Sequence, residues 1–114
     1  MYKVEGTTIT MVRGDSFVAS ISLSRNGEPY VPVNGDTIRF AAKKKIGDAK
    51  PCIEKTVPTD TLELKLMPSD TAKLPFGEYI YDLEITFADG GVDTFVHGGA
   101  LILLAEVGSG PYTS

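Results

Sequence analysis

The sequence predicts an all-β fold of about seven to eight short strands, an antiparallel β-sandwich or a small barrel, since both use the same alternation. Three observations indicate it. Apolar residues recur at every second position through most of the chain, which is the period of a half-buried strand. Turn-forming pairs rich in Gly, Asn and Asp separate these segments at regular intervals. Only the stretch near Ser69-Lys73 favours a helix, of about one turn with Ser69 as its N-cap.

In the first half, the clearest alternation runs from Asp15 to Ser24. Asn26-Gly27 follows at once and predicts a hairpin turn. The two prolines within 29–32 reduce the segment Tyr30–Val33 to an edge strand or an irregular connection. Further strands are expected at 37–45, 52–57 and 62–66. The side chains predicted to face the core are Phe17, Ala19, Ile21, Leu23, Ile38, Phe40, Ala42, Leu62, Leu64 and Leu66.

In the second half, Glu78 to Ala88 is the longest predicted strand, and Asp89-Gly90 predicts the hairpin after it. A return strand is expected at 92–97, a bulge at Gly98-Gly99 and a final strand at 100–107. One domain is therefore predicted at 1–107, followed by a flexible tail at 108–114. The inward side chains expected from the long strand are Tyr79, Tyr81, Leu83, Ile85 and Phe87.

Composition narrows the range of functions. The 114 residues carry a formal net charge of -4, which argues against nucleic acid as the main partner. The first residues lack the apolar core of a signal peptide, and no apolar run is long enough for a membrane span. Cys52 is the single cysteine, so no disulfide can form within the chain. We expect its thiol to be buried and inert, and the protein to be made in a reducing cytoplasm.

No set of residues predicts catalysis, a cofactor or a metal site. Cys52 and His97 are each alone and carry no catalytic signature. Asp82 and Glu84 share a strand face that points outward, so a paired acid and base is not expected there. Two charged motifs remain. Arg13-Gly14-Asp15 is interpreted as a turn before a strand. Lys43-Lys44-Lys45 is interpreted as a run of solvated lysines at a strand end.

The last strand departs from alternation, because both of its faces are apolar. These residues form the candidate interface: Ala100, Leu101, Ile102, Leu103 and Leu104. One face can meet the core, and the other needs a cover. That cover is either the tail or the segment Tyr30–Val33 of the same chain, or a partner at a subunit interface.

Two stretches carry a resemblance to a known family. One is Met11–Phe17 with the Ile21-Ser22-Leu23 strand and Asn26–Tyr30; the other is Leu64–Pro75 followed by Gly77–Leu83. With the hairpin at Asp89-Gly90, they resemble small bacteriophage and prophage proteins of the baseplate-upper-protein N-terminal type. The resemblance covers roughly Val4 to Val107. It implies an immunoglobulin-like β domain of virion tails and baseplates, and no catalytic residues.

The expected function is a non-enzymatic phage or prophage virion module of a tail, baseplate or fibre. Its expected partners are other virion proteins or copies of itself, with no nucleic acid, membrane or small-molecule substrate. The expected location is the bacterial cytoplasm during assembly and then the virion. The alternative is a free-standing carbohydrate- or cell-surface-binding module. The chain has no Trp for stacking on sugars, and the available aromatic residues are Tyr2, Tyr30 and Tyr112.

Overall fold

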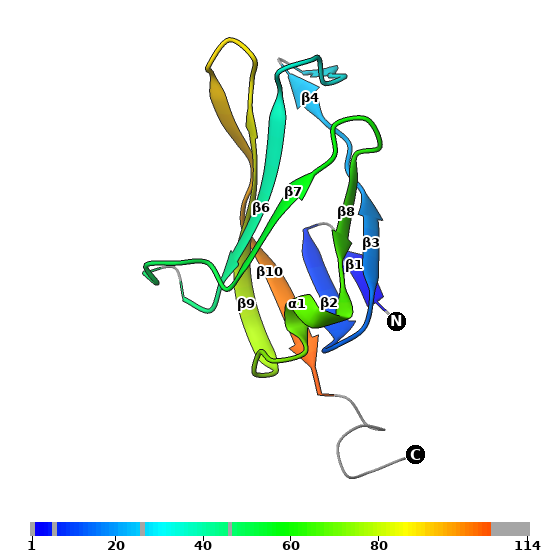
Figure 1. Ribbon diagram of the computed structural model, residues 1–114, viewed down its shortest axis with the longest axis vertical. Helices are drawn as coiled ribbons and strands as arrows, with labels where there is room; N and C mark the ends of the chain where they lie inside the picture. Colours follow the sequence, from blue (N-terminus) through cyan, green and yellow to red (C-terminus); the bar gives the residue numbers. More distant parts are fainter. Residues whose placement is uncertain (1, 6, 26, 46, 106–114) are drawn as a thin grey trace.

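A computed structural model describes residues 2–5, 7–25, 27–45 and 47–105, with side chains from residue 7 onward. This part of the chain is all-β with one short helix, as predicted (Figure 1). The elements are β1 (Tyr2–Glu5), β2 (Thr8–Val12), β3 (Phe17–Ser20), β4 (Ser24–Arg25), β5 (Glu28–Pro29), β6 (Thr37–Lys43), β7 (Ile53–Val57), β8 (Glu63–Leu66), α1 (Pro68–Thr71), β9 (Gly77–Thr86) and β10 (Val92–Leu104).

The strands form one large sheet and two small ones. The large sheet has the order β1-β2-β10-β9-β6-β7, β3 pairs with β8, and β4 pairs with β5. The pairing is antiparallel as predicted except at one place, where β2 runs parallel to β10 from Ile9–Leu101 to Val12–Leu104. β1 and β2 themselves lie outside the predicted strands, which begin at Asp15.

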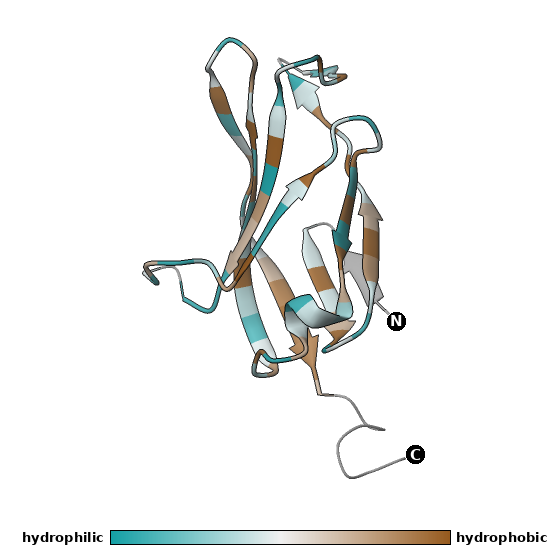
Figure 2. Cartoon of the chain, in the orientation of Figure 1, coloured by the Kyte–Doolittle hydropathy of each residue, from teal (hydrophilic) through white to brown (hydrophobic). Residues whose placement is uncertain are grey.

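The core lies between the large sheet and the β3–β8 pair, where alternate side chains meet. The predicted inward side chains of β9 are all buried, from Tyr79 to Ile85, and Phe87 just beyond the strand is buried too. Phe17, Leu64 and Leu66 face them from the small sheet. Figure 2 shows the resulting alternation of hydrophobic and hydrophilic bands along the strands. Each large apolar side chain buried there contributes about 1.5 to 3 kcal/mol.

The helical turn begins before the predicted position. Pro68 occupies the first turn, where its missing N–H has no helical partner to lose. Met67 is the N-cap residue instead of Ser69, and its amide donates a 2.7 Å hydrogen bond to Oδ2 of Asp70. Thr71 is fully buried, and its hydroxyl accepts a 2.8 Å hydrogen bond from the amide of Gly14. The turn therefore fixes the loop that leads into β3.

The two strands predicted at the C-terminal end are one strand, β10, interrupted by bulges. Its register against β9 shifts between Thr94 and Val96 and again between Val96 and Gly99. Gly98 has a φ of 68°, a conformation that side chains other than glycine rarely adopt. The expected bulge at Gly98-Gly99 is confirmed, and the chain continues through it instead of ending a strand.

Candidate interaction surface

The structure divides the candidate interface of β10 between its two faces. Leu101 and Leu103 are 0% and 1% exposed and belong to the core, so neither can contact a partner. Ala100 and Ile102 are half-buried on the opposite face, and Leu104 is 46% exposed. Only these three of the five predicted residues are available for an interaction.

Neighbouring strands extend this outward face. Val12 of β2 lies opposite Leu104, and Ile80 of β9 lies opposite Ala100. Both are half-buried and apolar. We call this set the outer strip: Val12, Ile80, Ala100, Ile102 and Leu104.

Polar residues border the outer strip on both sides of Ile102. The register places Thr10 of β2 and Glu78 of β9 beside it. Figure 2 shows hydrophobic colouring at the end of β10, where residues of both faces are apolar. An apolar strip with a polar border is the composition expected of a protein contact surface.

Of the two intramolecular covers considered for this face, Tyr30–Val33 lies elsewhere. Tyr30 packs edge-on against Phe87, with ring centroids 5.4 Å apart. Phe87 lies just beyond one end of β9, whereas Glu78, which borders the outer strip, lies near the other end. Nine residues of strand separate the two positions, about 30 Å at about 3.3 Å per residue. Val31 and Val33 are themselves exposed. The predicted tail, 108–114, lies outside the described residues, so that alternative stays untested.

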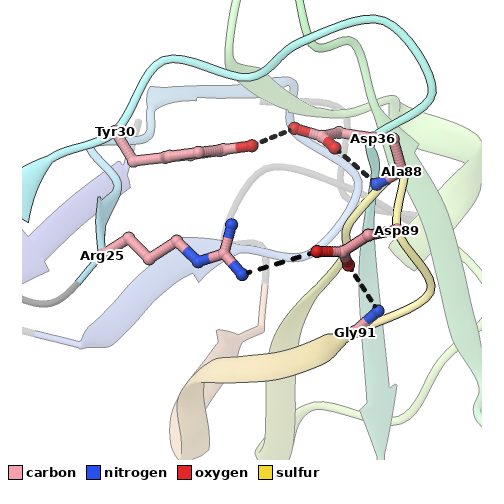
Figure 3. A network of polar contacts seen from close by, with 6 residues as sticks. All are labelled: Arg25, Tyr30, Asp36, Ala88, Asp89 and Gly91. Atoms are coloured by element: carbon pink, nitrogen blue, oxygen red, sulfur yellow. Dashed lines mark hydrogen bonds and ion pairs between the residues drawn. The ribbon is translucent and has the colours of Figure 1, made fainter.

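At the end of the sheet where Tyr30 lies, a single carboxylate joins three segments (Figure 3). Asp36 is buried, and its Oδ2 accepts hydrogen bonds from the Tyr30 hydroxyl at 2.5 Å and the Val33 amide at 2.9 Å. Its Oδ1 accepts a 2.8 Å bond from the Ala88 amide. The Tyr30 hydroxyl is the main cause that holds the pKa of Asp36 below its ordinary value, and the same bond raises the pKa of Tyr30.

Arg25 packs against the aromatic residues at the same end of the sheet. Its guanidinium carbon lies 3.8 Å from the centroid of the Phe87 ring and 5.8 Å from that of Tyr30. A 3.9 Å ion pair with Asp89 holds its other side (Figure 3). Tyr30 is thus half-buried, in contact with Phe87 and Arg25. The side chains of Tyr2 and Tyr112 lie outside the described part of the chain.

The motif Arg13-Gly14-Asp15 forms a turn before β3, as predicted. Gly14 has a φ of 85°, and the amide of Asp15 bonds to the carbonyl of Val12. The Arg13 guanidinium donates a 3.0 Å hydrogen bond to the carbonyl of Leu74. The arginine is therefore held against the protein rather than displayed at a loop tip.

His97, Asp82 and Glu84 have neighbours within the fold. Oδ1 of Asp82 lies 3.5 Å from Nδ1 of His97 and accepts a 2.8 Å hydrogen bond from the amide of Gly98 at the bulge. Glu84 lies opposite Arg39 of β6 on the outer face. Asp82 thus stabilises the bulge. No group of three or more potential metal ligands occurs among the residues with described side chains.

The expectation of a buried Cys52 is wrong, because the residue is exposed just before β7. Its thiol lies 3.4 Å from the carbonyl of Ala42, and partial burial is the main cause that raises its pKa. Lys43 donates to the carbonyl of Asp48 at 2.8 Å, and the ammonium of Lys44 lies 4.6 Å from the Tyr79 ring centroid. These lysines end β6, as expected.

The four-residue α1 is the only helix in the described ranges, and it is far too short to cross a membrane. Comparisons with protein-family models, with curated proteins and with solved structures find no match to this chain.

Sequence reasoning missed two members of the outer strip, Val12 and Ile80, and the role of Asp36. The strip members follow from strand register, which a single sequence does not give. Asp36 carries a partial signal, since Asn34-Gly35 before it is a turn-forming pair and carboxylates in turns commonly accept backbone hydrogen bonds.

Proposed function

We propose that this protein is a non-enzymatic structural module of a phage or prophage virion, in a tail, baseplate or fibre, and that it acts through protein contacts. The observation that carries the proposal is the outer strip, an apolar row over β2, β10 and β9. The resemblance of its strand and turn sequences to baseplate-upper-protein N-terminal domains supports the virion setting.

The strip suits a contact between proteins better than a small-molecule site. It lies on the outer face of the large sheet, and the hollow that Ile80 lines there is small, about 90 Å³, whereas small-molecule sites are larger and enclose their ligand. Leu104 and Ile102 project from a strand whose other face is locked in the core, so their positions are fixed before any partner binds. A rigid apolar patch needs little ordering on association.

The test is to introduce Ile102→Glu into the phage or prophage that encodes the protein and to measure its incorporation into purified particles. A charge at this position is expected to reduce incorporation at least tenfold while the circular-dichroism spectrum stays unchanged. The matched control is Val33→Glu, which places the same charge on an exposed valine at the other end of the molecule. Normal incorporation of Ile102→Glu, or particles that never contain the protein, would overturn the proposal.

A further inference from the structure

One side of the sandwich is open between the two sheets. β2 pairs with β10 only from Leu101 to Leu104, and within the described residues the stretch Val92–Ala100 pairs with β9 alone. β3 likewise pairs with β8 alone over the described part of the chain. Among the described residues, the edge of β10 before Leu101 and the chain at Ser20 and Ser22 therefore have no partner strand on this side, beyond the start of β2.

A groove of about 300 Å³ lies between these two edges. Ser20, Ile21 and Ser22 line one side, and Phe95 and Val96 line the other. Apolar side chains from both sheets line it, and the Tyr81 hydroxyl donates a 2.5 Å hydrogen bond to the Thr7 carbonyl. The lining residues are Thr7, Ile9, Phe17, Ala19, Ser20, Ile21, Ser22, Ser24, Leu64, Tyr81, Leu83, Phe95 and Val96, and none of them is charged.

Along residues 20–23, the backbone N–H and C=O groups of successive residues point to alternate sides of the chain. The amide of Ile21 donates to Leu62 at 2.8 Å, and the carbonyl of Leu23 accepts from Tyr30 at 2.9 Å, both on the side of β8 and β5. In an extended chain, neighbouring residues direct these groups to opposite sides. The backbone groups of Ser20 and Ser22 therefore point away from β8, along the side that lines the groove.

We propose that this groove binds an extended, uncharged segment of another protein as an added strand, with an apolar side chain at every second position. The unpaired backbone groups at Ser20 and Ser22 require an extended partner, because only a strand presents donors and acceptors at matching intervals. The apolar interior accepts the inward side chains. The uncharged lining selects against charged segments, since no group there would compensate a buried charge. The site is separate from the outer strip, which lies on the opposite face of the large sheet.

The proposal is tested by titrating the ¹⁵N-labelled protein with the blocked peptide Thr-Val-Thr-Val-Thr-Val-Thr and following amide shifts by NMR. We expect shifts confined to the groove, at Ser20, Ser22 and Val96, with a Kd below about 1 mM. The same peptide N-methylated at alternate residues should bind at least tenfold more weakly, because it lacks the donors along one edge. No shifts at millimolar peptide, or equal binding of the N-methylated peptide, would overturn the proposal.

Variants separate the groove from the rest of the surface. Val96→Asp should weaken peptide binding at least tenfold, whereas Met67→Asp, an exposed apolar residue outside the groove, should leave it unchanged. If Val96→Asp does not fold, Ser22→Pro removes one exposed edge amide and should give the same loss. Concentration-dependent dimerisation that Val96→Asp abolishes would place a strand of a second copy in the groove and overturn the assignment to another protein.

Discussion

The hydroxyl of Tyr30 donates a 2.5 Å hydrogen bond to the carboxylate of Asp36, which also accepts from the amides of Val33 and Ala88. One side chain thereby joins the segment after β5, the turn before β6 and the loop between β9 and β10. Ala88 is 52 positions from Asp36 in the sequence, and the bond between them lies just beyond Thr37 and Thr86, the last pair of β6 with β9 (Figure 3). The carboxylate therefore continues the connection between these segments past the last strand pair.

Replacing Asp36 should therefore destabilise the fold. Asp36→Asn keeps one acceptor oxygen but turns the other position into a donor facing an N–H or O–H group. Asp36→Ala removes both acceptors and leaves two backbone amides unpaired. We expect the midpoint of urea denaturation to fall in the order wild type, Asp36→Asn, Asp36→Ala. A wild-type midpoint for Asp36→Ala would contradict this role.

The same contact predicts an acid dependence of stability. The pKa of Asp36 in the folded protein lies below its ordinary value of 3.8, chiefly because of the Tyr30 hydrogen bond. The unfolded state therefore binds a proton at higher pH than the folded state does. This contribution is fully present above pH 3.8 and is lost as the pH falls through the lower folded-state pKa. Urea denaturation measured between pH 6 and pH 2 should show the loss.

Tyr30→Phe is the control for that pH dependence. It removes the hydroxyl that contributes most to the lowered pKa, so the pKa of Asp36 should move back toward 3.8. The decrease in stability below pH 4 should then be smaller than in the wild type. An identical acid profile in both proteins would show that other groups cause the dependence.

Truncation of two neighbouring residues of β10 should destabilise the fold to very different extents. Leu103 is 1% exposed in the core, so Leu103→Ala should reduce the free energy of unfolding by about 2 to 5 kcal/mol. Ile102 lies half-buried on the outer strip, and Ile102→Ala should cost less than about 1 kcal/mol. Urea denaturation of both variants checks the difference. Equal losses would mean that the two faces of the strand are not distinguished as the structure shows.

The contrast between these two residues also shows how far a sequence alone can lead. Alternation identifies the inward side chains of β9 correctly, because residues two apart in a strand share a face. In Ala100–Leu104 every residue is apolar, so the pattern marks an unusual strand without saying which face is inward. Register with β2 and β9 decides it, and register depends on pairing between distant segments.

The same limit explains the missed strands and groove. β2 is short, and it is placed by its parallel contact with β10. The groove exists because β10 begins at Val92 whereas β2 joins it only from Leu101 onward, a relationship that no local pattern contains. Asp36 was visible only as a turn residue, since its partner Ala88 is 52 positions away.

Gly99 provides a test of the packing between the β10 bulge and the sheet beside it. A Cβ added at Gly99 would lie 2.7 Å from two ring carbons of Tyr81 and 3.1 Å from the carbonyl of Thr7. That ring is held by its own hydrogen bond to Thr7, so it cannot move away without losing the bond. Gly99→Ala should therefore reduce the free energy of unfolding by about 1 to 3 kcal/mol.

The matched control for Gly99→Ala is Gly47→Ala. Nothing lies within 4 Å of a Cβ added at Gly47, so its substitution should change stability by no more than about 0.5 kcal/mol. The crowding also predicts that Gly99→Ala combined with Tyr81→Leu is less destabilised than the sum of the single variants, because the shortened side chain makes room for the methyl group. Additive losses in urea denaturation would show that the cost of Gly99→Ala comes from the backbone rather than from contact with the Tyr81 ring.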